Sequence, residues 1–354
     1  MNHLTDVRAA LTERGADALL VLDELNQHYL SGFAFTDGFL LITAVGAYLV
    51  TDFRYYENAG KHAYADFEVV MPEDRRAFID EKLSEAGAKT VGFEGNSVSY
   101  ATYLSYKDAH PDVKFVDIGD MIEELRRLKT PEELEKMQKA QDITDLAFSH
   151  IVKVLTPKMT EIEVAAELEY IMRKNGADGF AFDTIAVSGD ASALPHGTPR
   201  NVPLKKGFLT MDYGAKFDGY CSDMTRTVVI GRADEEIKKV YHTVLRAQTE
   251  AMAYLKEGAD CGEADKIARD IIDASYPGTF GHSLGHSVGL YIHESPRLYS
   301  RGFGKKLRSD EIVTVEPGIY LFGKYGCRIE DMVAIRKDGV HDFTRSPKDL
   351  IEIL

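Results

Sequence analysis

Apolar residues in the first third of the chain follow two alternating spacings. Leu4, Val7 and Leu11 recur every three or four positions, which is the period of one face of a helix. Residues 18–22 form a short apolar run that predicts a buried strand. Residues 38–52 predict two strands that fold back about a glycine. This alternation predicts a compact α/β domain, and it contains no glycine-rich loop of the phosphate-binding kind.

A highly charged segment then predicts a boundary between two domains, residues 1–125 and residues 126–354. Within the segment, Thr130, Pro131 and Glu133 stand in the order of an N-cap, a first helical proline and the glutamate of a capping box. We therefore expect a long helix to begin at Pro131.

Later segments repeat one order of elements. Helices are expected over residues 160–176, 234–256 and 262–274, with pairs of strands between and after them. The order of helices, strand pair, helices and strand pair indicates two similar halves, although the residues themselves show no clear repeat.

Composition restricts the partners and the compartment. Lys plus Arg number 42 and Asp plus Glu number 57, which gives a net charge of −15 and disfavours nucleic acid and anionic membranes. No apolar run is long enough to span a membrane, and the first residues do not resemble a signal peptide. The three cysteines form no disulfide or metal-binding spacing, so we expect a cytoplasmic protein.

Residues 207–231 predict a β-hairpin whose turn is Asp218-Gly219. This turn places Asp212 opposite Thr225, with Asp223 diagonally beside Asp212 on the same face. Two carboxylates so close repel each other, and a divalent cation would relieve the repulsion. The alternative is that one aspartate is exposed while the other caps a turn.

Two further β-rich runs, residues 312–320 and 327–335, flank a glycine-rich turn. Glu316 and Glu330 are equidistant from the centre of that turn, so we expect them to face each other among apolar neighbours. Buried glutamates are costly unless a metal or a cation holds them. Arg328 shares the strand parity of Glu330 and could orient it; the alternative is a buried Glu–Arg salt bridge.

Residues 280–297 contain three histidines, His282, His286 and His293. A glycine at every fourth position disfavours a helix, so His282 and His286 are expected on a loop or irregular strand and His293 on a short strand that it ends. A further histidine, His196, lies in a proline-flanked loop suited to the wall of a site.

One imidazole with four carboxylates is a hard, oxygen-rich ligand set. It favours a pair of Mn²⁺, Co²⁺ or Zn²⁺ ions over a structural zinc, with Mn²⁺ as the first choice. Four carboxylates would balance the charge of two divalent ions, which could hold a bridging hydroxide for hydrolysis.

Five motifs resemble the metal ligands of the pita-bread metallopeptidases: Asp212 in MDYG, Asp223 in SDMTRT, His286 in GHSLGHSVG, Glu316 in VEPGIY and Glu330 in RIEDMV. The segments TDFRYYE and PHGTP resemble the Xaa-Pro branch of that family, prolidase and aminopeptidase P. The resemblance implies an α+β protein with an N-terminal α/β creatinase-like domain followed by a pita-bread catalytic domain.

The resemblance also implies a role for each ligand. Asp212 would bind one metal ion, Asp223 and Glu330 would bridge both ions, and His286 and Glu316 would complete the other. Glu316 would additionally serve as the general base on the attacking water.

The resemblance assigns further residues to the substrate. His196 and His293 would stabilise the tetrahedral intermediate, and His282 matches another histidine of the site. Arg297 matches an arginine that would meet the C-terminal carboxylate of the substrate in prolidase-like members.

Other positions would support the metal ligands or depart from the family. Thr225 would support the metal cluster through its hydroxyl, and Arg328 would lie behind the ligands. Ser287 stands where the family usually has glycine, which could narrow the site or change the metal preference.

The function implied is hydrolysis of small peptides that carry proline after the scissile bond. Dipeptidase and aminopeptidase activities remain open, and a homodimer is expected by analogy with the relatives. Three alternatives are a non-catalytic pita-bread module that binds peptides or proteins, a metal-free creatinase-like hydrolase and a methionine aminopeptidase.

Overall fold

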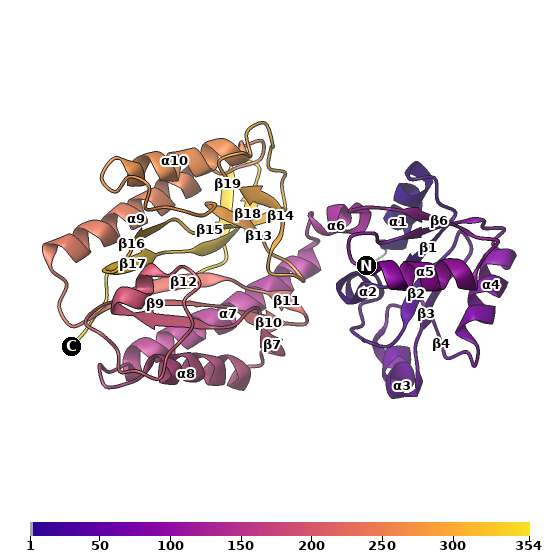
Figure 1. Ribbon diagram of the computed structural model, residues 1–354, viewed down its shortest axis with the longest axis horizontal. Helices are drawn as coiled ribbons and strands as arrows, with labels where there is room; N and C mark the ends of the chain where they lie inside the picture. Colours follow the sequence, from indigo (N-terminus) through magenta and orange to yellow (C-terminus); the bar gives the residue numbers. More distant parts are fainter. Residues whose placement is uncertain (1–2) are drawn as a thin grey trace. The chain divides into compact units, whose positions relative to one another are not determined.

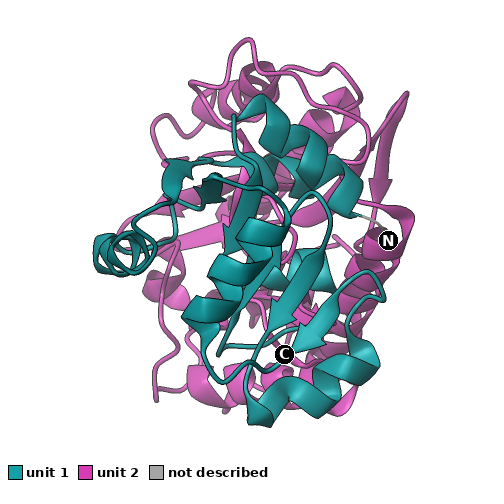
Figure 2. Cartoon of the chain, turned by 90° about the vertical axis from the view of Figure 1, so that its right-hand side faces the viewer, with its two compact units in different colours: residues 1–126 teal, residues 127–354 magenta. Residues whose placement is uncertain are grey.

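A computed structural model describes residues 3–354 of the chain. The chain divides into two compact units, residues 1–126 and residues 127–354, which Figure 2 colours teal and magenta. No helix within residues 3–354 is both long and apolar enough to cross a membrane.

The first unit is built on one mixed six-stranded sheet in the order β4-β3-β2-β1-β5-β6. Its strands are β1 (Ala18–Val21), β2 (Phe39–Ile42), β3 (Ala47–Val50), β4 (Glu68–Val70), β5 (Thr90–Phe93) and β6 (Lys114–Asp117). Its helices are α1 (His3–Glu13), α2 (Glu24–Ser31), α3 (Phe53–His62), α4 (Arg75–Glu85), α5 (Tyr100–Ala109) and α6 (Met121–Arg126).

The periodicity of the first third is confirmed in this unit. Leu4, Val7 and Leu11 are all buried on α1, because their spacing gives that helix one apolar face. Strands β2 and β3 form an antiparallel pair in which Ile42 faces Ala47 across the turn. The fold is therefore α/β here, as the alternating patterns predict.

The second unit holds two pairs of helices and several small sheets (Figure 1). The helices are α7 (Pro131–Val154), α8 (Glu161–Lys174), α9 (Glu235–Tyr254) and α10 (Cys261–Asp273), with a 3-10 turn η1 (Gly189–Ala193). The strands in the first half of this unit are β7 (Gly179–Phe180), β8 (Ile185–Ser188), β9 (Gly207–Tyr213), β10 (Ala215–Phe217), β11 (Tyr220–Cys221) and β12 (Met224–Ile230).

The remaining strands follow α10. They are β13 (Gly285–Ser287), β14 (Glu294–Leu298), β15 (Ile312–Val315), β16 (Gly318–Leu321), β17 (Tyr325–Arg328), β18 (Asp331–Arg336), β19 (Gly339–Asp342) and β20 (Glu352–Ile353). In Figure 1 the strands lie between the pair α7 and α8 on one side and the pair α9 and α10 on the other.

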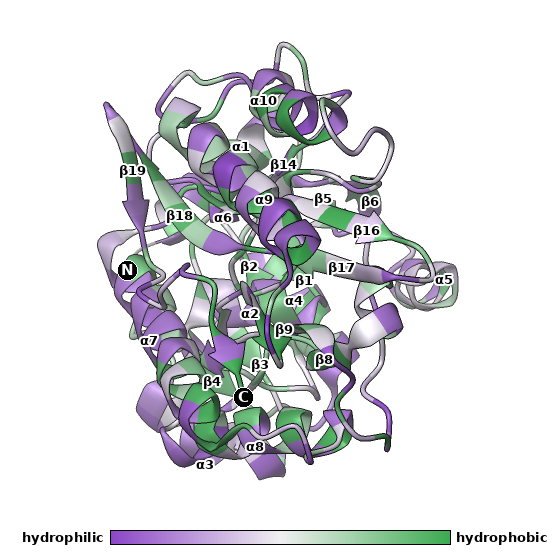
Figure 3. Cartoon of the chain, turned by 90° about the vertical axis from the view of Figure 1, so that its left-hand side faces the viewer, coloured by the Kyte–Doolittle hydropathy of each residue, from purple (hydrophilic) through white to green (hydrophobic). Residues whose placement is uncertain are grey.

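Each pair of helices buries its own apolar face against the strands. Helices α7 and α8 form one hydrophobic cluster with β8, β9 and β12, and α9 and α10 form a second with β15 to β18. Figure 3 shows both hydrophilic and hydrophobic residues along α9, and its buried residues recur every three or four positions, as expected for a helix with one covered face. The two halves thus repeat one arrangement, a helix pair packed on a strand pair.

The helix starts follow the capping signals. Thr130 and Glu133 form both hydrogen bonds of a capping box in front of α7, and Pro131 is its first residue. Thr160 and Glu163 form the same arrangement before α8. Each box pairs backbone N–H groups that a helix end would otherwise leave unsatisfied.

Candidate metal centre

The first carboxylate pair lies on the antiparallel strands β9 and β12. Phe217 pairs with Tyr220 around the Asp218-Gly219 turn, and Asp212 pairs with Thr225, as the turn predicts. The strands are interrupted just before Met224, where Asp223 turns its buried carboxylate toward the same cavity that Asp212 lines.

The second carboxylate pair also has the predicted register. Val315 pairs with Asp331 on β15 and β18, and Gly318 pairs with Arg328 on β16 and β17. Glu316 and Glu330 therefore face each other between two stretches of paired strand. The turn itself is tighter than the expected five residues, because Leu321 already pairs with Tyr325.

The histidine of the cluster, His286, lies on β13 beside β15. A Cβ on Gly285 would come within 1.9 Å of the Thr314 carbonyl oxygen, so glycine is needed for this close approach. The backbone N–H of His286 donates to Thr314 Oγ1 at 3.1 Å, and that hydroxyl donates to Glu316 Oε1 at 3.3 Å. One threonine thus joins the strand of the histidine to the glutamate.

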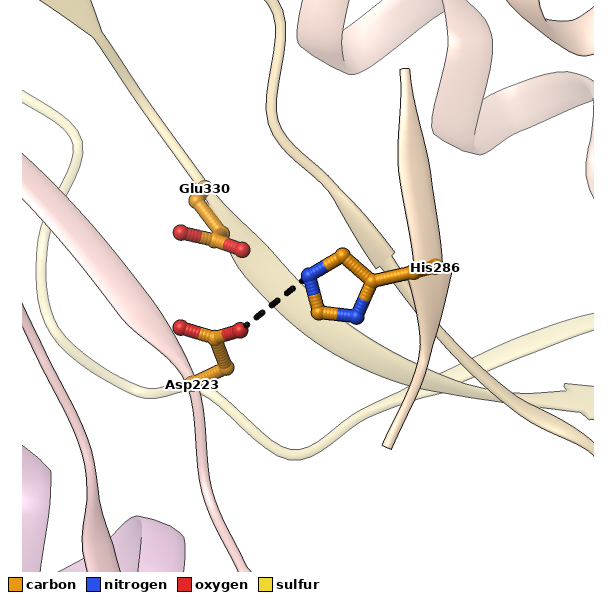
Figure 4. A group of neighbouring side chains, drawn as sticks. All are labelled: Asp223, His286 and Glu330. Carbon is orange, nitrogen blue, oxygen red and sulfur yellow. Dashed lines mark ion pairs between the residues drawn. The ribbon is translucent and has the colours of Figure 1, made fainter. Parts of the chain in front are cut away.

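Three of the candidate ligands converge closely enough to share one ion. Asp223, His286 and Glu330 each offer a ligand atom, and these atoms all lie within 4.8 Å of one another (Figure 4). His286 Nε2 is 3.6 Å from Asp223 Oδ2 and 3.4 Å from Glu316 Oε1. His286 Nδ1 lies 3.1 Å from the Ser287 carbonyl, which can only accept, so the proton belongs on Nδ1.

The facing atoms are then all acceptors. The lone pair of His286 Nε2 points at carboxylate oxygens, and Asp212 Oδ1 is buried with no hydrogen-bond partner among residues 3–354. A cation is the group that such a set of acceptors lacks. The residues therefore suit divalent metal ions.

The electrostatics of the centre agree with this. Burial raises the pKa of Glu316 to about 8, and burial together with neighbouring carboxylates raises the pKa values of Asp223 and Glu330 well above their ordinary range. Burial also lowers the pKa of His286 to about 4, which leaves a neutral imidazole. The imidazole is thus already in the neutral form that a metal ligand needs. The three acids need bound cations to offset the cost of burying their charged forms.

Arg328 does not form the expected contact with Glu330. Within the described residues its ion pair is with Asp212, from Nη2 to Oδ2 at 2.6 Å. Its Nε donates to Thr225 Oγ1 at 3.0 Å, and that hydroxyl donates to Glu330 Oε2 at 2.6 Å. Arg328 therefore reaches Glu330 through Thr225, and the alternative of a direct Glu–Arg salt bridge is wrong.

A second arginine holds the backbone of the two hairpins. Arg226 is almost fully buried, and its Nη1 donates to the carbonyl oxygens of Thr225 and Glu330 at 3.0 and 2.7 Å. Its other N–H groups donate to Asp331 and to the carbonyls of Ser346 and Pro347. All five donors of the guanidinium are used, which fixes the strands that carry the carboxylates.

His282 is fixed by a tyrosine that the sequence reasoning missed. His282 Nδ1 lies 2.9 Å from the Ser283 carbonyl, and its Nε2 is 2.8 Å from the hydroxyl of Tyr320, which accepts from Arg328 at 2.8 Å. Burial lowers the pKa of His282 to about 3, so the ring is neutral and its Nε2 accepts from Tyr320. In the sequence, the feature that could have pointed to Tyr320 is its hydroxyl, four residues after Glu316.

His293 is not on a strand. Strand β14 begins one residue later, because Glu294 turns the chain back: its Oε1 accepts from the Tyr291 backbone N–H at 3.1 Å. The ring of His293 nevertheless contacts that of His286, with centroids 4.5 Å apart.

The candidate site residues line a cavity of about 570 Å³. Every residue proposed from the sequence lines it except Thr225; the lining set is His196, Asp212, Asp223, His282, His286, His293, Arg297, Glu316, Arg328 and Glu330. Arg297 lies directly across the β13–β14 pair from His286. Ser287 is buried, and it is absent from the described lining, so its side chain does not narrow the cavity.

Comparison with known proteins identifies the fold. Residues 135–337 match metallopeptidase family M24, and residues 3–128 match the creatinase/prolidase N-terminal domain. The chain belongs to metallopeptidase family M24. It is a two-domain pita-bread metallopeptidase, and the relatives give no support to a non-catalytic binding module.

Relatives of this M24 metallopeptidase match over nearly their whole length. An uncharacterized peptidase of Bacillus subtilis is 40% identical over 98% of this chain and 99% of its own. An Xaa-Pro dipeptidase of Pyrococcus horikoshii is 37% identical over 96% of each chain.

Solved structures agree with this. An Xaa-Pro dipeptidase from Bacillus anthracis has a TM-score of 0.94 at 39% identity, covering 99% of this chain and 98% of that one. An X-Pro aminopeptidase from Thermotoga maritima has a TM-score of 0.92 at 36% identity, covering 98% and 100%. The M24 fold is therefore shared with both kinds of enzyme.

Proposed function

We propose that the chain is an Xaa-Pro dipeptidase. The observation that carries the proposal is Arg297, which lines the cavity across the strand pair from His286 and has no ion pair within residues 3–354. The guanidinium of Arg297 can therefore bind a substrate group beside the metal centre, and it suits the free C-terminal carboxylate of a dipeptide. The catalytic domain in this proposal is residues 126–354, preceded by an N-terminal domain of residues 1–125.

Five side chains hold two divalent ions in the proposed site: Asp212, Asp223, His286, Glu316 and Glu330. All five line one cavity, and ligand atoms of Asp223, His286 and Glu330 lie within 4.8 Å of one another, which supports this assignment. When bound, such ions polarise the scissile carbonyl and lower the pKa of the attacking water.

The protein residues around the ions bind the proton and the substrate oxygen. Glu316 takes the proton of the attacking water, since its carboxylate lines the cavity and its Oε1 lies 3.4 Å from His286 Nε2. His196 and His293 line the cavity and donate N–H groups to the oxygen of the tetrahedral intermediate. Burial lowers the pKa of His293, so its ring is a neutral donor at neutral pH.

Proline explains why metal chemistry suits this substrate. An Xaa-Pro bond is a tertiary amide without an N–H, so an enzyme cannot hold it through that donor. Recognition then falls to the termini of the peptide. Apart from the five ligands and Arg328, the charged residues that line the cavity are Arg297 and Asp183, and neither has an ion pair in the described chain. This cation and this anion, without an ion pair among residues 3–354, complement a zwitterionic dipeptide.

Three finer assignments accompany this function. We assign Mn²⁺ as the native ion because the ligands are mostly carboxylates. The cysteines Cys221, Cys261 and Cys327 are buried thiols, which supports a reducing cytoplasm. A homodimer remains our expectation from the relatives.

The test compares an Xaa-Pro dipeptide with an Xaa-Pro-Xaa tripeptide, each with added Mn²⁺ and each after treatment with a chelator. Turnover of the dipeptide alone supports the proposal, and equal turnover of the tripeptide means an aminopeptidase. Circular dichroism in parallel should show the fold retained after chelation, because the apolar core is large.

A further inference from the structure

One loop forms a continuous wall of the cavity. Residues 195–199 all line it, and His196 is the titratable residue among them. The His196 side chain is exposed, and it has no hydrogen bond, ion pair or ring contact within residues 3–354. The position of the ring is therefore set by the points where the loop is anchored.

The first anchor lies before the loop. Ser192 Oγ accepts from the Gly326 backbone N–H at 2.9 Å and donates to the Gly189 carbonyl at 2.6 Å. This serine ties the entrance of the loop to strand β17, which carries Arg328.

The second anchor lies after the loop and is an ion pair. Arg200 binds the carboxylate of Glu161 with two nitrogens, from Nε to Oε2 at 2.8 Å and from Nη2 to Oε1 at 2.7 Å. The Arg200 backbone N–H donates to Oε2 at 3.0 Å as well. Ser188 completes the shell, since its N–H and its hydroxyl donate to Oε1 at 2.8 and 2.9 Å.

This anchor is rigid for physical reasons. The Glu161 side chain is fully buried at the start of α8, while that of Arg200 is 38% exposed. Burial alone would raise the pKa of Glu161, but hydrogen bonds from Arg200 and Ser188 lower it, so the carboxylate stays charged. The backbone adds a bond from the Ile162 N–H to the Arg200 carbonyl at 3.3 Å. A bidentate pair of this kind fixes orientation as well as distance.

We propose that Glu161 and Arg200 are positioning residues that hold His196 at the substrate. The proposal rests on the proposed function, because His196 must contact the substrate for its position to affect turnover. Arg200 ends the segment that carries His196. Glu161 fixes Arg200 to helix α8, where Glu161 itself lies, and to strand β8 through Ser188. Loosening this anchor lets the wall of the cavity move while the metal ligands stay in place.

The test is a double-mutant cycle of Arg200→Ala and His196→Ala, assayed on an Xaa-Pro dipeptide at saturating Mn²⁺. Arg200→Ala should lower kcat/KM about 10- to 100-fold in the native background, as small misplacements of a reacting group do. It should have almost no effect when His196 is already alanine. Arg200→Lys, which keeps one charged bond, should recover part of the loss.

The matched control is Lys205→Ala, which removes the exposed Asp190–Lys205 pair a few residues away and should leave kcat/KM unchanged. Hydrogen exchange over residues 194–203 should quicken in Arg200→Ala and not in the control. An equal loss in both backgrounds, no loss in either, or no effect of His196→Ala itself would overturn the proposal. If the native chain turns over no Xaa-Pro peptide, the proposed function fails, while hydrogen exchange still reports whether the anchor holds the loop.

Discussion

The hydroxyl of Thr225 donates a 2.6 Å hydrogen bond to Glu330 Oε2, joining the hairpin of Asp212 to the strand of the second carboxylate pair. The Thr225 hydroxyl oxygen itself accepts from Arg328 Nε at 3.0 Å. The hydrogen bond from Thr225 is therefore polarised toward the carboxylate of Glu330. It holds Oε2 in place and so fixes the direction in which Oε1 points.

Replacing Thr225 with valine keeps the shape of the side chain and removes this bond. We expect the affinity for Mn²⁺ to fall about 10- to 100-fold, as is usual when the partner of a metal ligand is lost. Titration calorimetry on the metal-free protein measures this directly. Thr225→Ser keeps the hydroxyl and serves as the control; an unchanged affinity in Thr225→Val would show that the bond does not orient Glu330.

Replacing Glu316 with glutamine tests the general base. The amide can still offer an oxygen to an ion but cannot take a proton at neutral pH, so kcat should fall about 10²- to 10⁴-fold. Metal content, measured on the same sample at saturating Mn²⁺, separates the loss of the base from the loss of an ion. Full activity in this variant would contradict the role assigned to Glu316.

Arg297→Ala tests recognition of the carboxylate. The KM for an Xaa-Pro dipeptide should rise about 10- to 100-fold, since a hydrogen bond between charged groups is lost. The KM for the corresponding Xaa-Pro amide should stay the same. Arg301, an exposed arginine outside the cavity lining, provides the control substitution to alanine. A parallel rise for the amide would assign Arg297 another role.

A buried glutamate in the first unit predicts a dependence of stability on pH. Glu94 Oε2 accepts from the backbone N–H groups of Leu22 and Asp23 at 2.7 and 2.9 Å, and its Oε1 accepts from Asn26 at 2.8 Å. Burial nevertheless raises the pKa of Glu94 from 4.5 to about 7. The folded chain then binds this proton more tightly than the unfolded chain does.

The free energy of unfolding should consequently fall as the pH rises from about 4.5 to about 7, by up to about 3 kcal/mol from this group. Glu94→Gln cannot titrate and should lack that part of the slope. Urea unfolding of both chains at pH 5 and pH 8 measures the difference, with the exposed Glu68→Gln as the control. Curves that stay parallel for the native chain and Glu94→Gln would contradict the raised pKa.

Turn chemistry and symmetry about a glycine were enough to predict both carboxylate hairpins. An Asp-Gly turn fixes the register of its strands, and the register fixes which residues share a face. The convergence of Asp212 with Asp223, and of Glu316 with Glu330, followed from those two rules.

Contacts between hairpins could not be predicted in the same way. Strand parity predicted the face on which Arg328 lies. It could not predict which carboxylate of another sheet would pair with Arg328, and the structure shows that this carboxylate is Asp212. The bend before His293 depends on the side chain of Glu294, a local bond that competes with the strand. Thr314 and Tyr320 carry no charge, so composition gave no reason to single them out.

The buried guanidinium of Arg226 affects when the catalytic unit can finish folding. Two of its acceptors, the carbonyls of Ser346 and Pro347, follow it by more than a hundred residues. A nascent chain that has not yet released those residues from the ribosome must leave this cation in water or bury it without two of its five acceptors. The catalytic centre should therefore form late in synthesis, and a ribosome stalled before Ser346 should hold a chain that cannot retain Mn²⁺.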